Sequence, residues 1–312
     1  MPRISVIIPT HNRPALLAEA LLSLREQTLT DWEAIIVDDA SSTPVTISET
    51  DARIRILRHT KSQGGAAAKN AGIREARAEI LAFLDDDDLY APTYLEKAIN
   101  ILERNPELDV IFMGVAWFGA GGEWGQSNYD EAMAKVLVEA LGKTIEEEKL
   151  IIFGEEIIDA LLKSVPMAFQ RPVVRKRAIE RIGLYQPDCL LWDCDWAIRA
   201  ALNAKTGLFQ DGLYRQRAEG QGYSSRRDRK QEHLNSGIEI KERLLQDARS
   251  GRYPQHHIPT LKKAVSKAWF DLAWHHCHQQ NKSKAVAALC FSELRQFSLS
   301  NLKLFARILR NF

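Results

Sequence analysis

The N-terminal part of the chain alternates short apolar runs with helical segments, and this alternation restricts the fold more than any other feature. Runs rich in Ile, Val and Leu lie at 4–8, 32–37, 54–57 and 80–84, with segments of helical pattern at 16–24 and 66–76. Near-continuous apolar runs are typical of strands buried on both faces, and strands separated by helices form parallel sheets. The sequence therefore predicts an α/β fold with a mostly parallel sheet and helices on both faces.

Polar segments follow three of these strands, at 9–12, at Asp38 and Asp39, and at 85–88. Ligands of such sheets bind in the crevice outside the carboxyl ends of the strands, so a site is expected at that edge. Asp38 and Asp39 are either a turn-capping pair or acceptors of hydrogen bonds from a base or ribose. No GxGxxG loop follows the first strand, which disfavours a dinucleotide-binding enzyme.

Four consecutive aspartates, Asp85, Asp86, Asp87 and Asp88, follow the apolar run at 80–84. Like charges this close destabilise one another unless a cation or a proton neutralises them. Mg²⁺ and Mn²⁺ accept carboxylate oxygens and leave coordination positions for the phosphate oxygens of a substrate. The alternative is an acidic cap for the following helix, because carboxylates stabilise helix N-termini.

Two further carboxylates, Asp193 and Asp195, lie between Trp192 and Trp196 at the start of an expected helix. Neighbouring aromatic rings would desolvate them and raise a pKa toward a value suited to a general base. The alternative is a capping aspartate with tryptophans in the core.

Composition excludes several classes of protein. Lys and Arg total 42 against 41 Asp and Glu, a balance that argues against nucleic acid as a partner. The chain has no run of eighteen apolar residues, and its first strand begins at residue 4, so neither a membrane span nor a signal segment is predicted. The four cysteines fit buried thiols in a reducing compartment, and a cytoplasmic location is expected.

The remainder of the chain gives coarser expectations. Another strand is predicted at 110–113, a loop or lid at 119–128, mainly helix at 131–162, and helices near 91–104, 175–182 and 193–203. After about residue 226 the pattern is helical throughout.

Six segments resemble, in order, the motifs of inverting family 2 glycosyltransferases with the GT-A fold. They are SVIIPTHNR at 5–13, QT at 27–28 with WE at 32–33, VDDAS at 37–41, GAAAKNAGI at 65–73, FLDDDD at 83–88 and DCDWAIR at 193–199. The resemblance is strong over 1–118 and moderate over 165–225. It implies transfer of a sugar from a nucleotide diphospho-sugar, with UDP the favoured nucleotide and Mn²⁺ or Mg²⁺ the cofactor. The acceptor would be a saccharide or a lipid-linked acceptor in polysaccharide or glycoconjugate synthesis.

The resemblance also implies residue roles. Pro9 and His11 would line the base pocket, Asp39 would bind the base, and Asp38 would support its loop. Lys69 would contact phosphate. Asp86, with Asp85 as competitor, would face the ribose, and Asp87 would hold the metal. Asp88 has the weakest claim and is expected to cap the next helix. Asp193 would be the catalytic base, with Asp195 as the alternative.

These expectations divide the chain into a GT-A catalytic domain at 1–225 and a helical region at 226–312. The catalytic domain comprises a nucleotide-sugar half at 1–118, an acceptor half at 165–225 and a helical insert at 125–165. The apolar and basic tail, which includes Phe297, Leu304 and Arg310, would lie on the inner face of a membrane or pack on the catalytic domain or on a second subunit in a homodimer. Two other classes stay open: a non-catalytic nucleotide-sugar or carbohydrate-binding protein on this fold, and a nucleotidyltransferase, which would carry a basic glycine-rich loop that this sequence lacks.

Overall fold

A computed structural model describes residues 1–47, 51–219, 229–293 and 303–304. The chain forms two compact units, one of Met1–Asp188 with Trp192–Gln221, the other of Cys189–Leu191 with Gly222–Phe312. The predicted boundary at 225–226 lies outside the described residues.

The N-terminal half of the first unit is the predicted parallel sheet. Its strands are β1 (Ile4–Thr10), β2 (Trp32–Asp38), β3 (Ile54–Arg58) and β4 (Ile80–Phe83), in the spatial order β3-β2-β1-β4. Every pair in this group is parallel, with Ile7 opposite Ile35 of β2 and Phe83 of β4. The apolar side chains of β1, β2 and β4 are buried, and the carboxyl ends of the strands meet at one edge. That edge carries the polar segments identified in the sequence.

Beyond β4 the sheet becomes mixed. The strand β9 (Pro172–Arg175) runs antiparallel between β4 and β6 (Val110–Phe118), and β10 (Thr206–Arg217) pairs parallel with β6. The short strands β5 (Leu89–Tyr90), β7 (Lys143–Ile145) and β8 (Leu150–Ile152) add antiparallel pairs. Within the described residues the sheet has ten strands, so the α/β class is confirmed although its second half is less regular than expected.

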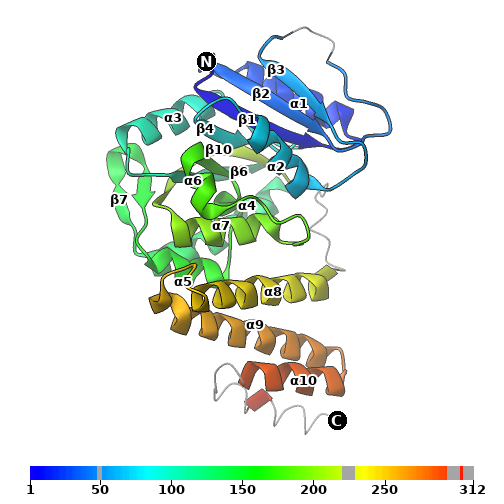
Figure 1. Ribbon diagram of the computed structural model, residues 1–312, viewed down its shortest axis with the longest axis vertical. Coiled ribbons are helices and arrows are strands. Elements are labelled where there is room, and N and C mark those ends of the chain that lie inside the picture. The colour runs from blue at the N-terminus through cyan, green and yellow to red at the C-terminus, as the bar shows by residue number, and fades with distance from the viewer. Residues whose placement is uncertain (48–50, 220–228, 294–302, 305–312) are drawn as a thin grey trace. The chain divides into compact units, whose positions relative to one another are not determined.

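Helices cover both faces of the sheet (Figure 1). They are α1 (Pro14–Arg25), α2 (Gly65–Glu75), α3 (Tyr94–Arg104), α4 (Gly122–Ala140), α5 (Glu156–Lys163), α6 (Lys176–Ile182) and α7 (Trp192–Asn203), with the 3-10 helices η1 (Glu146–Glu148) and η2 (Met167–Gln170). Helix α2 lies directly on β1, where Gly72 packs against the side chain of Ile7.

Of two expectations for the middle of the chain, one is wrong and the other is confirmed but incomplete. The segment 119–128 is not a loop over its whole length, because α4 begins at Gly122. The segment 131–162 is mainly helical, as predicted, but the short strands β7 and β8 and the 3-10 helix η1, which were not predicted, separate α4 from α5. The glycines at the start of α4 obscured the beginning of that helix, and strands of three residues are too short to show a period of two.

The second unit is helical where it is described, as predicted. It contains α8 (Lys230–Arg249), η4 (Gln255–His257), α9 (Ile258–His278) and α10 (Lys282–Glu293). Their apolar faces form a core that includes Ile238, Leu272 and Leu289, and Leu304 packs into the same core. Of the predicted tail surface, Leu304 is therefore buried, whereas 294–302 and 305–312 lie outside the described residues.

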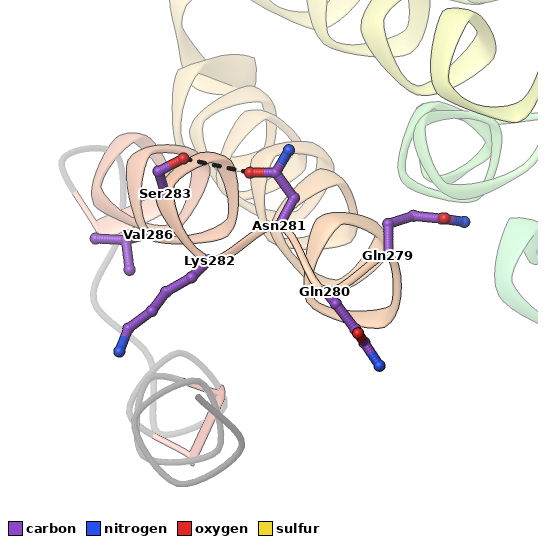
Figure 2. Close-up of a pocket in the computed structure, with 6 residues that line it drawn as sticks. All are labelled: Gln279, Gln280, Asn281, Lys282, Ser283 and Val286. Carbon is purple, nitrogen blue, oxygen red and sulfur yellow. Dashed lines mark hydrogen bonds between the residues drawn. The ribbon is translucent and has the colours of Figure 1, made fainter.

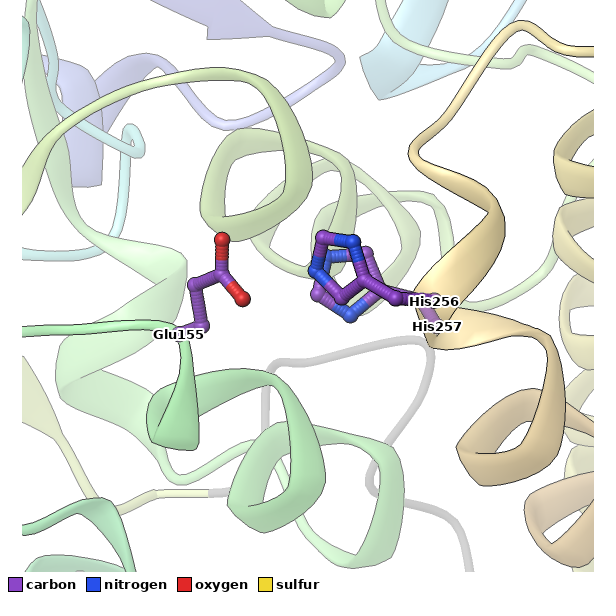
Figure 3. Close-up of side chains that lie close together, drawn as sticks. All are labelled: Glu155, His256 and His257. Atoms are coloured by element: carbon purple, nitrogen blue, oxygen red, sulfur yellow. The ribbon is translucent and has the colours of Figure 1, made fainter.

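The turn between α9 and α10 forms a shallow surface hollow lined by Gln279, Gln280, Asn281, Lys282, Ser283 and Val286 (Figure 2). Asn281 caps α10 here, because its side-chain oxygen accepts hydrogen bonds from the Ser283 hydroxyl and the Lys284 amide. In η4, the rings of His256 and His257 lie side by side with centroids 4.0 Å apart (Figure 3). No helix in the described ranges is both long and apolar enough to cross a membrane.

Candidate active site

The ends of β1 and β4 are joined by hydrogen bonds, and this places the acidic run at the centre of the site. The Leu84 amide donates to the Ile7 carbonyl at 3.1 Å, which continues the strand pairing one residue beyond β4. At the last residue of β1, the Thr10 hydroxyl donates to a carboxylate oxygen of Asp86 at 2.7 Å. The segments 9–12 and 85–88 therefore form one site, as the sequence predicts.

Asp39 holds the loop that precedes α2. Its two carboxylate oxygens accept hydrogen bonds from the His59 ring at 2.6 Å, from the Ser62 hydroxyl at 2.7 Å, and from the amides of Gln63 and Gly64. Burial raises the pKa of Asp39, but these donors outweigh it and lower the pKa below its ordinary value. Because both oxygens are used in this way, Asp39 fixes the 59–64 loop.

The other predicted base-pocket residues lie around Asp39. His11 is exposed and its Nδ1 donates to the backbone carbonyl of Asp39 at 2.7 Å, and Pro9 is half-buried in β1. Asp38 is buried, accepts the amides of Ser41 and Val45 at 2.8 and 3.2 Å, and is paired with an arginine of β3, Arg58. Asp38 therefore fixes the loop after β2.

Asp85 is held by two buried cations. The Lys69 ammonium lies 2.8 Å from one carboxylate oxygen, and the Arg171 guanidinium lies 3.2 Å from the other. Burial raises the pKa of Asp85, but the charges of Lys69 and Arg171 outweigh it and lower the pKa. The Lys69 ammonium also lies 4.7 Å from the centre of the Trp192 ring, and Lys69 is only 2% exposed. The side chain that was predicted to contact phosphate therefore pairs with Asp85 in this structure.

Asp86 and Asp87 share a third cation. The Nη1 atom of Arg13 lies 3.1 Å from Asp86 Oδ1 and 2.9 Å from Asp87 Oδ2. Burial nevertheless raises the pKa of Asp86 to about 6, and burial together with the charge of Asp85 raises the pKa of Asp87. The two carboxylate oxygens thus converge on a position that accepts a cation, and their charge is incompletely compensated. A divalent ion fits this donor set.

Asp88 does not cap a helix, which corrects the expectation from the sequence. It is fully buried and accepts hydrogen bonds from the Tyr214 hydroxyl at 2.8 Å and the Arg217 amide at 2.9 Å, both in β10. The following helix, α3, begins only at Tyr94 and has no side-chain cap. Asp88 instead fixes the segment between β4 and β5 to β10.

The two aspartates of α7 differ sharply in environment. Asp195 is fully buried and lies 2.9 Å from the guanidinium of Arg199, one turn further along the helix. Asp193 is half-buried, and one oxygen accepts the Cys194 amide at 2.8 Å.

Contacts of Lys69 place the start of α7 beside the acidic run, because its ammonium lies 4.7 Å from the Trp192 ring and 2.8 Å from Asp85. Burial raises the pKa of Tyr185, and the charges of Asp193 and Asp85 raise it further. Burial lowers the pKa of Arg171, but Tyr214, Asp85, Asp88 and Asp193 raise it well above its ordinary value. Asp193, the expected base, and Asp85 of the acidic run therefore both raise the pKa of Tyr185 and the pKa of Arg171.

Several residues of the site were not predicted. Arg13 lies in the first motif but received no role, and Arg171, Tyr214 and Arg217 belong to segments in which no motif was recognised. Arg171 precedes β9, and the residues around it in the sequence form no recognisable motif. Only the need of four adjacent aspartates for positively charged partners could have indicated its role.

The fold is that of the GT-A-type transferases. S. aureus TarS has the same fold, with a TM-score of 0.61 over 97% of this chain and 50% of TarS, at 15% identity. TarS 1-349 in complex with UDP-GlcNAc gives a TM-score of 0.58 over 95% of this chain and 92% of that one, at 15% identity. The Pyrobaculum calidifontis mannosyltransferase PcManGT, solved in complex with GDP-Man and Mn²⁺, gives a TM-score of 0.56 at 20% identity. The match covers 98% of this chain and 79% of PcManGT.

The chain belongs to glycosyl transferase family 2, whose model matches residues 5–182, more than half of its length. An uncharacterized glycosyltransferase of Haemophilus influenzae is 36% identical over 110 residues, which are 35% of this chain and 37% of that protein. The Escherichia coli UDP-Glc:alpha-D-GlcNAc-diphosphoundecaprenol beta-1,3-glucosyltransferase WfgD is 32% identical over 105 residues, 33% and 42% of the two chains. The chain thus matches less than half the length of these curated relatives. The resemblance found in the sequence is confirmed.

Proposed function

We propose that the chain is a metal-dependent inverting glycosyltransferase that moves a sugar from a nucleotide diphospho-sugar to an acceptor hydroxyl. The observation that carries the proposal is the convergence of Asp86 and Asp87 on one cation position. Asp193 directly follows Trp192, whose ring lies 4.7 Å from the Lys69 ammonium that pairs with Asp85. Family membership supports the same reaction.

The four aspartates differ in side-chain exposure, and we assign their roles in metal binding, ribose binding and structure on that basis. The side chain of Asp87 is 14% exposed and would ligate Mn²⁺ or Mg²⁺, with Asp86 beside it. The side chain of Asp85 is 25% exposed, against 6% for Asp86, so Asp85 is the better ribose contact. Asp88 has no exposed surface and keeps a structural role.

The donor base would lie against the loops that Asp38 and Asp39 hold, beside Pro9 and His11. UDP is the favoured nucleotide, because the relative with a named activity uses UDP-Glc and TarS is solved with UDP-GlcNAc. The acceptor would be a saccharide or lipid-linked hydroxyl in the synthesis of a polysaccharide or glycoconjugate. The name of the Escherichia coli relative describes a lipid-linked acceptor of this kind.

For catalysis, Asp193 would take the proton of the acceptor hydroxyl while that oxygen attacks the anomeric carbon. The bond between the anomeric carbon and the diphosphate oxygen breaks in the same step, with inversion. The bound divalent ion supplies stabilisation of the negative charge on the departing diphosphate. Asp195 would have a structural role and not a catalytic one, because its side chain is inaccessible and is paired with Arg199.

A screen of nucleotide diphospho-sugars by thermal shift, with and without Mn²⁺, tests the donor. A ligand at a hundred times its dissociation constant adds about 2.7 kcal/mol to the free energy of unfolding, which is readily measured. Hydrolysis of the selected donor, followed by ¹H NMR, should first release the sugar anomer opposite to that of the donor. Release of the same anomer would contradict inversion.

The competing hypothesis is a non-catalytic protein that binds nucleotide sugar or carbohydrate on the same fold. The Asp193→Asn variant distinguishes the two. A transferase loses turnover and retains donor binding, whereas a binding protein shows no turnover in the wild type for the variant to lose.

A further inference from the structure

The acidic run is compensated by three cations that differ in how firmly they are held. The side chains of Lys69 and Arg171 are 2% and 6% exposed, and both contact Asp85. Arg13 contacts the pair Asp86 and Asp87, and its side chain is 31% exposed. Two of the counter-ions are therefore built into the core, and the third lies at the surface of the site.

The backbone of Arg13 is anchored at the start of α1, and its long side chain reaches the carboxylates. Arg13 is the residue before α1, and its carbonyl accepts the Leu17 amide at 3.0 Å, which anchors the main chain. The long side chain extends from this anchor to the carboxylates. A change of side-chain rotamer can thus move the guanidinium without disturbing the helix.

A divalent ion and the guanidinium cannot both occupy the position between Asp86 and Asp87, because like charges a few ångströms apart repel strongly in a partly buried site. The ion therefore competes with Arg13 for the same oxygen of Asp87. A displaced guanidinium remains next to the site, where the donor diphosphate would bring new acceptors. Arginine pairs with phosphate through two parallel hydrogen bonds, so the new position is also favourable.

We propose that Arg13 is an exchangeable counter-ion, which neutralises Asp86 and Asp87 in the absence of donor, yields Asp87 to the divalent ion, and then binds the donor diphosphate. This inference rests on the proposed function. It gives Arg13 two successive partners, first the carboxylates and then the diphosphate. Removal of the Arg13 side chain should therefore strengthen metal binding and weaken nucleotide binding.

The test compares Arg13→Gln with Arg3→Gln, a control that removes the same charge from a pair with Glu103 on the surface. Mn²⁺ affinity is measured without nucleotide, from the electron paramagnetic resonance signal of free Mn²⁺. Arg13→Gln should bind Mn²⁺ about tenfold more tightly than the wild type, since the competing guanidinium is absent. At saturating Mn²⁺ it should bind UDP, or GDP if the donor screen selects it, about tenfold more weakly by calorimetry. Arg3→Gln should match the wild type in both measurements.

A second variant, Arg13→Lys, keeps the charge and loses the forked geometry. It should bind Mn²⁺ within about threefold of the wild type and still bind the nucleotide more weakly. Unchanged or weaker Mn²⁺ binding by folded Arg13→Gln would overturn the inference and leave the proposed function standing. A wild-type protein that binds neither Mn²⁺ nor nucleotide diphosphate would overturn both.

Discussion

Replacement of Asp86 with asparagine should stabilise the metal-free protein. Burial raises the pKa of Asp86 to about 6 from an ordinary value of 3.8, even with Thr10 and Arg13 as partners. Each pKa unit corresponds to about 1.4 kcal/mol, so the ionised carboxylate costs at most about 3 kcal/mol at neutral pH. Relaxation of the site reduces this cost, and a gain of about 1–3 kcal/mol is expected for Asp86→Asn.

The pH dependence of this effect has a definite sign. Between pH 3.8 and about 6 the folded protein retains a proton on Asp86 that the unfolded chain has released. The contribution of Asp86 to the free energy of unfolding therefore falls as the pH rises through this window, and the full penalty is present above it. The advantage of Asp86→Asn should accordingly be largest above pH 7 and should disappear near pH 4.

Urea denaturation in EDTA, at several pH values between 4 and 8, measures both quantities. Asp38→Asn is a matched control, because Asp38 is equally buried but its pKa is lowered by hydrogen bonds from Ser41 and Arg58 despite the opposing effect of burial. That variant should lose stability at pH 7.5. A loss of stability in Asp86→Asn at pH 7.5, or a difference that does not change with pH, would refute the reasoning.

Three further predictions concern α7 and the packing of helices. Asp193→Asn should lower turnover at least about a hundredfold with unchanged donor affinity by calorimetry, and turnover near the wild-type value would exclude Asp193 as the base. Asp195→Asn should cost about 3 kcal/mol in urea denaturation because it leaves the charge of Arg199 buried, while the folded fraction retains activity. Wild-type stability would contradict that assignment. Gly72→Ala should cost about 1–3 kcal/mol, since an added Cβ would overlap a side chain of β1. Its control, Gly237→Ala in α8, has room for a Cβ and should gain up to about 1 kcal/mol, so equal effects at the two positions would contradict the packing argument.

The sequence predicted the parallel half of the sheet because β1, β2 and β4 are buried on both faces and leave near-continuous apolar runs. The edge strand β3 is partly exposed and gives a shorter apolar pattern. It did not predict β10, which contains two glycines, several polar residues and a register shift between Phe209 and Tyr214. Nor did it predict β9, a strand of only four residues that enters the sheet antiparallel and ends with Arg175.

In the candidate site too, some residues could be predicted from the sequence and others could not. The carboxylates could be predicted because they follow strands whose ends meet at one edge. Their counter-ions could not, because Arg13, Lys69 and Arg171 come from three separate segments that only the folded chain brings to the acidic run. The structural role of Asp88 was missed for the same reason, since its partners lie in β10.

The central claim is that the acidic run holds a nucleotide diphosphate through a divalent ion on Asp87. Isothermal titration calorimetry with UDP and GDP, for the wild type and Asp87→Asn, each with Mn²⁺ and with EDTA, tests it most directly. The wild type should bind one nucleotide with Mn²⁺ and at least about tenfold more weakly in EDTA, and Asp87→Asn should bind weakly in both. Equal affinity in all four conditions, or no binding to the wild type with Mn²⁺, would contradict the claim.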